Sequence, residues 1–133
     1  MKDLVLDKML SVGIDEIDED HRRLVDLFNM LNHAVSKGAE PEYLAALLEE
    51  LINCTVWHFS HEERLMLQYR YAGYAAHKSE HQELVQSVRQ LQEKILESGG
   101  FDAEADLEFL EGWLTGHILA NDMKLGSYLA EVM

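Results

Sequence analysis

The segment from His58 to His81 reads HFSHEERLMLQYRYAGYAAHKSEH and contains two pairs of metal-ligating residue types at helical spacing. His58 and Glu62 are four residues apart, and so are His77 and His81. Residues four apart on an α-helix lie on one face, so each pair would point its side chains in one direction. Between the pairs lies Gly73, where one helix can end and the chain can turn back. The segment therefore predicts two consecutive helices that each supply part of a metal site.

The residues on either side of this segment predict further helices. Apolar residues recur at spacings of three and four, which is the pattern of a helix with one apolar face. Short turns between such helices favour an all-α, up-down-up-down four-helix bundle, in a single domain of residues 1–133. The aperiodic Val12-Gly13-Ile14 is expected to pack across the bundle. The predicted segments are an N-terminal arm over 1–17, a helix from an N-cap at Asp18 to the stop at Gly38, a helix from Pro41 in its first turn to the turn at Gly73, a helix carrying His77 to Ile95 and stopped by Gly99, a helix carrying Leu107 to Asn121, and a short helical tail over about 122–131.

The composition limits the kinds of partner that the chain can have. Its 133 residues carry a formal net charge of −14, which argues against nucleic acid and against an anionic membrane surface, since both attract basic proteins. No apolar run approaches the roughly 18 residues of a membrane span, and acidic residues interrupt any signal-peptide core near the N-terminus. Cys54 is the one cysteine, so an internal disulfide cannot form. We expect a monomeric, cytoplasmic protein, whose protein partner, if it has one, the sequence does not name.

Five of the seven histidines fall on the inward faces of the predicted helices, where leucine would be usual. Burying an imidazole without a polar partner is costly. One buried histidine would be unremarkable, but a set drawn from all four helices requires a common partner, and a buried metal ion is the economical one. Neutral imidazole suits iron, zinc, copper and nickel. These histidines are His21, His58, His77, His81 and His117.

Two carboxylates are candidates to complete the metal site. Glu62 shares a helix face with His58 and can bridge two metal ions. Asp122 lies five residues after His117, which on a regular α-helix turns it roughly 140° away. Asp122 faces inward only if the helix loosens near Asn121; alternatively, Asp122 caps the tail, and the residues alone do not decide between the two. With one bridging oxygen atom, these ligands leave one position open on a pair of six-coordinate metals, enough for one small ligand.

The ligand pattern differs from that of the ferritin-like di-iron bundles. Those proteins use Glu-x-x-His pairs and further carboxylates, whereas this chain has His-x-x-x-Glu and His-x-x-x-His. Fewer anionic ligands disfavour high-valent iron, so we infer reversible binding of a small ligand rather than bond-breaking oxidation.

A family resemblance is carried by several of these segments together. The chain resembles the single-domain bacterial hemerythrins over about residues 12 to 128. Any one segment is a weak signal, whereas their combined spacing is specific. The matching segments are Val12-Gly13-Ile14…Ile17-Asp18…His21-Arg22-Arg23-Leu24, His58-Phe59-x-x-Glu62-Glu63…Met66, Tyr71-Ala72-Gly73-Tyr74, His77-Lys78-x-Glu80-His81 and Trp113-Leu114-x-x-His117-Ile118…Asp122.

The resemblance implies a non-haem centre of two iron ions with dioxygen as its ligand. It implies that one iron has three histidine ligands and the other has two, that two carboxylates bridge the irons, and that dioxygen binds at the two-histidine iron in a dry pocket. The implied iron ligands are His77, His81 and His117 on one ion, His21 and His58 on the other, and Glu62 and Asp122 as bridges. The implied pocket residues are Phe59, Trp113, Leu114, Ile118 and Leu24.

The chain departs from the family at one position of the N-terminal arm. Many relatives carry a tryptophan there that covers the pocket, and Leu6 aligns with it. A smaller cover admits water more readily, so we expect faster autoxidation of the oxygenated protein than in a Leu6→Trp variant. Equal decay rates in the two proteins would contradict this.

Three further residues are not expected to be metal ligands. His33 and His61 are both expected to be exposed and to lie outside the site. Cys54 lies one turn before His58 and is expected to be a small core residue, with a redox-sensitive thiol near the metal as the alternative.

The sequence thus predicts a dioxygen-binding di-iron protein for storage, delivery or sensing, rather than an enzyme in the strict sense. A di-iron oxidase or peroxidase, or a protein that handles nitric oxide or peroxide, is the enzymatic alternative. An iron donor for cluster repair is a third reading of the same residues.

Overall fold

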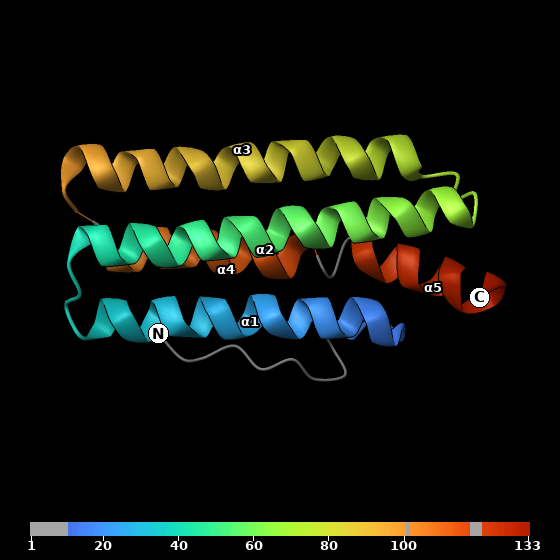
Figure 1. Cartoon of the computed structure of the whole chain (residues 1–133), viewed down its shortest axis with the longest axis horizontal. Helices are drawn as coiled ribbons and strands as arrows, with labels where there is room; N and C mark the ends of the chain where they lie inside the picture. Colours follow the sequence, from blue (N-terminus) through green and yellow to red (C-terminus); the bar gives the residue numbers. More distant parts are fainter. Residues whose placement is uncertain (1–10, 101, 118–120) are drawn as a thin grey trace.

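The computed structural model describes residues 11–100, 102–117 and 121–133, and this part of the chain contains five helices and no strands. Figure 1 shows α1 to α4 side by side with alternating direction, and α5 continuing beyond the end of α4. Helix α2 packs against α1 and α3, and α4 packs against the same two helices. The all-α four-helix bundle with a short helical tail is therefore confirmed. The helices are α1 (Asp15–Ser36), α2 (Pro41–Gln68), α3 (Tyr74–Ser98), α4 (Ala103–His117) and α5 (Met123–Val132).

The core is the apolar seam along which the four long helices face one another. Its side chains recur three and four residues apart on each helix, as the sequence pattern predicts. Fully burying a leucine, isoleucine or phenylalanine contributes roughly 1.5–3 kcal/mol each, so this seam holds the helices in register around the polar residues set within it. The largest fully buried side chains include Ile17, Phe28, Leu48, Ile52, Met66, Ile95 and Leu110.

The start of α1 differs from the prediction. Asp18 is not the N-cap: the helix begins at Asp15, and no side chain caps it. Instead the Asp18 carboxylate accepts hydrogen bonds from the Val12 backbone N–H at 2.8 Å and from the Ser11 hydroxyl at 2.6 Å. The carboxylate is thus used to hold the arm, and the helix can begin one turn earlier.

The arm segment Val12-Gly13-Ile14 packs on the bundle, which confirms its prediction. Val12 and Ile14 are both buried, and Gly13 has a φ of +81°, a left-handed conformation that glycine adopts without strain. Val12 approaches α5 so closely that a Cβ added at Gly126 would lie 2.3 Å from the Val12 carbonyl oxygen. Val12 of the arm and Gly126 of α5 therefore lie in close contact.

The turn between α2 and α3 is built differently from the expectation. Pro41 occupies the first turn of α2, as predicted, but the left-handed residue after α2 is Arg70, with a φ of 57°, and Gly73 has an ordinary φ of −82°. A Cβ at Gly73 would lie 2.8 Å from a ring carbon of Tyr71, so a larger residue there would require the Tyr71 ring to shift. Gly99 ends α3 in the left-handed conformation, as predicted.

The junction between α4 and α5 resolves the two alternatives for Asp122. Residues 121–122 have π-helical geometry, which spaces residues five apart on nearly the same face. The Asp122 side chain makes no capping hydrogen bond to α5 and is fully buried. The expected loosening near Asn121 is therefore present, and Asp122 faces inward. In the described part of the chain, no helix is long and apolar enough to cross a membrane.

Candidate metal centre

Seven buried side chains from all parts of the bundle meet in one cluster. They are at most 6% exposed, and their nitrogen and oxygen atoms form two groups, within each of which the atoms lie within 4.8 Å of one another. Glu62 and Asp122 belong to both groups. The first group adds His77, His81 and His117 to these carboxylates, and the second adds His21 and His58.

Each shared carboxylate turns one oxygen atom to each group. Asp122 Oδ1 lies 3.0 Å from the Nε2 atoms of both His77 and His117, whereas Asp122 Oδ2 lies 2.7 Å from His21 Nε2. Glu62 Oε1 lies 3.0 Å from His81 Nε2, and Glu62 Oε2 lies 3.5 Å from His58 Nε2. This is the arrangement that two carboxylates bridging a pair of cations require.

Many of the inward-pointing atoms approach one another without forming hydrogen bonds. Within the described residues, the Nε2 atoms of His77, His81 and His117, both Glu62 carboxylate oxygens and Asp122 Oδ1 are buried without a hydrogen-bond partner. Leaving a buried polar atom unpaired costs about 1–3 kcal/mol. Imidazole nitrogens and carboxylate oxygens are ligands for first-row transition metals, so two cations at the centres of the groups would satisfy the set. The residues present therefore fit a pair of metal ions.

The electrostatics of the cluster also favour positive charge. Burial alone would lower the pKa of His58, but the nearby charges of Glu62 and Asp122 and the hydrogen bond to Asp20 raise it to about 9. Burial and the charge of Asp122 would raise the pKa of Glu62, but the neighbouring histidines lower it to about 2. The pKa of Asp122 is likewise held well below its usual range by His117, His21 and His58, so both carboxylates are ionised at neutral pH and attract positive charge.

Three further carboxylates hold the outer nitrogen of a clustered histidine. The Nδ1–H groups of His58 and His81 donate to Asp20 and Glu63 at 2.9 Å, and His117 Nδ1 lies 3.4 Å from Glu80. Such a bond fixes the ring orientation and leaves Nε2 with a free lone pair. The sequence prediction did not include Asp20, and it included Glu63 and Glu80 only within the matching family segments, without a role. Each of the three is directly adjacent to a clustered residue in the chain.

A small cavity of about 10 Å³ lies beside the cluster and touches His21 and His117. A cavity of this size has room for about one water-sized particle. Four of the five predicted pocket residues line it, namely Leu24, Phe59, Trp113 and Leu114. Thr55 and Leu84 also line it and were not predicted. Ile118, the fifth predicted pocket residue, and Leu6, its predicted cover, lie outside the described residues.

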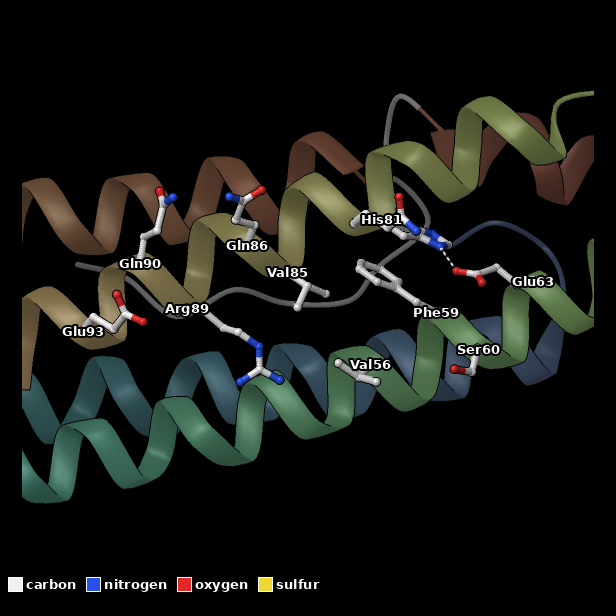
Figure 2. Close-up of a pocket in the computed structure, with 11 residues that line it drawn as sticks. Val56, Phe59, Ser60, Glu63, His81, Val85, Gln86, Arg89, Gln90 and Glu93 are labelled. Atoms are coloured by element: carbon white, nitrogen blue, oxygen red, sulfur yellow. Dashed lines mark hydrogen bonds and ion pairs between the residues drawn. The ribbon is translucent and has the colours of Figure 1, made fainter.

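The cavity wall is held by specific contacts. The Trp113 indole N–H donates to the Leu84 carbonyl at 3.0 Å, so the polar atom of Trp113 is satisfied away from the cavity. Phe59 stacks flat on His81, with ring centroids 3.7 Å apart and an interplanar angle of 3°. Figure 2 shows Phe59 and His81 side by side, with Glu63 bonded to His81, at one end of a surface groove between α2 and α3. Phe59 lines both the small cavity and this groove, and therefore lies between the two.

The remaining predictions concern His33, His61 and Cys54, which were not assigned as metal ligands. His33 is exposed, as predicted. His61 is not: its side chain is only 12% exposed, because its Nδ1 lies 2.6 Å from Asp20 Oδ2. Cys54 is half-buried and packs against the core, and the fully buried Thr55 takes the inward position that faces the cavity.

Comparisons with known proteins place the chain beside a family of cation-binding domains. The hemerythrin HHE cation binding domain matches residues 12–129. A bacteriohemerythrin of Pseudomonas paraeruginosa is 34% identical over 123 residues, which cover 92% of this chain and 78% of that protein. A bacteriohemerythrin of Methylococcus capsulatus is 34% identical over 85% of this chain and 86% of its own length. The crystal structure of a wild-type hemerythrin has a TM-score of 0.80 at 30% identity, covering 90% of this chain and 91% of that chain.

Proposed function

Because the chain belongs to the hemerythrin HHE cation-binding family, we propose that it is a non-haem di-iron protein that binds dioxygen reversibly, for storage, delivery or sensing. Family membership and the buried cluster support an iron-binding, oxygen-handling protein. The observation that carries the finer proposal is the pair of shared carboxylates, Glu62 and Asp122, each with one oxygen atom turned to each group of histidines. A single metal ion would use only one of the two oxygen atoms of each carboxylate.

The proposed ligands follow the two groups. His77, His81 and His117 would hold one iron, His21 and His58 would hold the other, and Glu62 and Asp122 would bridge them. When bound, a pair of ferrous ions supplies electrons that can be shared with dioxygen and recovered when it leaves.

The chain's own residues favour binding over bond cleavage. Leu24, Phe59, Trp113 and Leu114 line the cavity with apolar surface that excludes water. Among the side chains that line it, Thr55 carries the one hydroxyl group, and that hydroxyl donates to the Leu51 carbonyl at 2.7 Å. Apart from His21 and His117, the side chains that line the cavity offer no free proton donor, and this disfavours the protonation that accompanies reduction of dioxygen.

An optical titration tests the proposal. The purified protein would be loaded with iron, reduced without air and then exposed to it while its spectrum is recorded. We expect charge-transfer bands that arise with air and vanish on deoxygenation, over repeated cycles, at two irons per chain. Irreversible oxidation in the first cycle would contradict reversible binding. Peroxide turnover far above that of free iron would favour the enzymatic alternative, and rapid loss of iron to a chelator would favour an iron donor.

Substitutions test the ligand assignment separately. His77→Ala or His81→Ala should lose the three-histidine iron, and Glu62→Ala should affect both ions because it removes a bridge. His33→Ala, at an exposed histidine, is the matched control and should retain both irons. Two irons per chain in all three cluster variants would show the assignment to be wrong.

The domain, location and oligomeric state remain predictions. A single domain over 1–133 agrees with a family match over 12–129. A monomer in the cytoplasm is the state that we propose. Size-exclusion chromatography with light scattering measures the mass in solution and would contradict the monomer if it gave a multiple of 15.3 kDa.

A further inference from the structure

A chain of side-chain contacts runs from the surface of α1 to His58. Asp20 Oδ2 accepts hydrogen bonds from two imidazoles, at 2.9 Å from His58 Nδ1 and 2.6 Å from His61 Nδ1. On its other side, His61 Nε2 lies 3.0 Å from Glu16 Oε2, whose side chain is half-exposed. The contacts therefore join Glu16, His61, Asp20 and His58 in one line across the interface between α1 and α2.

Asp20 is the most buried of the three carboxylates that hold clustered histidines. Its side chain is 8% exposed, against 21% for Glu63 and 30% for Glu80. A carboxylate that is removed from water needs more than one donor to remain ionised and fixed in place. His61 supplies the second donor to Asp20, on the same oxygen atom that holds His58.

The position of the Asp20 carboxylate sets the ring orientation of His58. A hydrogen bond from Nδ1–H to a carboxylate sets the tautomer and the ring orientation of a histidine whose Nε2 serves as a ligand. If His61 were removed, Asp20 could rotate about its side-chain bonds, and His58 would lose its defined direction. Trp57 lies beside His61, with ring centroids 5.5 Å apart and the two rings tilted by 48°.

We propose that His61 is a positioning residue for the half of the metal centre formed by His21 and His58, and that it acts through Asp20. This inference rests on the proposed function, since it presumes a metal in that half. His61 touches none of the reacting atoms; it holds the residue that orients His58.

The test compares two replacements of His61. His61→Leu keeps a similar bulk and removes both ring nitrogens, whereas the amide N–H of His61→Gln can still donate to Asp20. His33→Leu, at an exposed histidine of α1, is the control. Each protein is loaded with ferrous iron without air, and iron per chain and the time course of iron loss to a chelator are measured.

We expect His61→Leu to lose one of its two irons about 10-fold faster than the unchanged protein, the lower end of the 10- to 100-fold loss of affinity that is usual when a direct partner of a metal-bound histidine is removed, because His61 acts through Asp20. The other iron should leave at the unchanged rate. His61→Gln should recover most of the retention, and His33→Leu should match the unchanged protein. Unchanged release in His61→Leu overturns the proposal, and so does equal loss in the Leu and Gln variants, because the hydrogen bond would then not be the cause.

A second readout uses the metal-free protein and separates this inference from the proposed function. Nitrogen-15 NMR detects the His58 Nδ1–H proton as a slowly exchanging signal when Asp20 holds it. The signal should persist in His61→Gln and broaden or vanish in His61→Leu, with unchanged far-UV circular dichroism in both. Persistence in His61→Leu overturns the inference. If the unchanged protein failed to bind two irons, the proposed function would fall while this signal still reported the role of His61 in orienting His58.

Discussion

Gly126 lies where α5 meets the N-terminal arm, and its replacement by alanine should destabilise the protein. A Cβ at this position would lie 2.3 Å from the Val12 carbonyl oxygen and 2.8 Å from the Val12 Cβ. Both distances fall below the 3.0 Å under which a neighbour must move. Val12 cannot move freely, because its backbone N–H is bonded to Asp18 at 2.8 Å. The strain must therefore displace α5, the arm, or both.

The magnitude follows from two opposing effects. Overpacking against a held backbone costs about 1–3 kcal/mol, and alanine in place of glycine within a helix returns up to about 1 kcal/mol. We expect a net loss of about 1–2 kcal/mol in the free energy of unfolding, which for a chain of this length lowers the melting temperature by roughly 4–8 °C. Asp122 directly precedes α5, so a displaced α5 should also reduce the iron retained per chain.

Gly112→Ala provides the matched control. Gly112 is an exposed residue of α4, and a Cβ there would meet no atom within 4 Å. The same substitution should therefore stabilise the protein by about 0.5–1 kcal/mol. Denaturant unfolding of both variants, with iron analysis of each, measures the difference. If Gly126→Ala were as stable as Gly112→Ala and retained as much iron, the packing argument would be refuted.

Three further predictions concern the thiol, the cavity wall and the metal. Burial raises the pKa of the Cys54 thiol. Because the thiolate is the reactive form, alkylation of Cys54 at neutral pH should be slower in the folded protein than in the unfolded chain, and its pH midpoint should be higher. A midpoint below that of the unfolded chain would support a redox-active thiol. Trp113→Phe removes the hydrogen bond to the Leu84 carbonyl and part of the cavity wall, so it should lower the free energy of unfolding by about 1–3 kcal/mol. The control Trp57→Phe, at a 63% exposed side chain, should change the free energy of unfolding by less than about 0.5 kcal/mol. Equal losses in the two variants would contradict the role of Trp113. Removing bound metal from the loaded protein with a chelator should lower the free energy of unfolding by about 4 kcal/mol or more, because polar atoms of the cluster are then left buried without hydrogen-bond partners. An unchanged melting temperature after chelation would count against a structural metal pair.

The helices could be predicted closely because their signals are local. Pro41 and Gly99 act on the backbone within one turn of their own positions, and α2 and α3 begin or end where these residues predict. Asp18 shows the limit of the same reasoning. Aspartate is a favoured N-cap residue, but Ser11 and Val12 of the arm donate hydrogen bonds to the Asp18 carboxylate instead. The position of the arm cannot be inferred from helix propensities.

The candidate site could be predicted in part for the same reason. The spacing of four between His58 and Glu62 places both on one face of α2 wherever that helix lies. His61 was wrongly expected to be exposed, because its burial depends on Asp20, which lies 41 positions earlier in the chain. Asp20 itself was missed, since nothing in the spacing within α1 shows which side chain of α2 it will meet.

The amino-acid sequence alone determined that four helices would each turn histidine inward, because the face of a residue follows from the period of its own helix. Only the tertiary structure decided that Asp122 faces the cluster rather than capping α5, which oxygen of each shared carboxylate meets which group, and that Asp20 joins His58 to His61. Those outcomes depend on where one helix lies against another, and that placement is set by core packing between residues far apart in the chain.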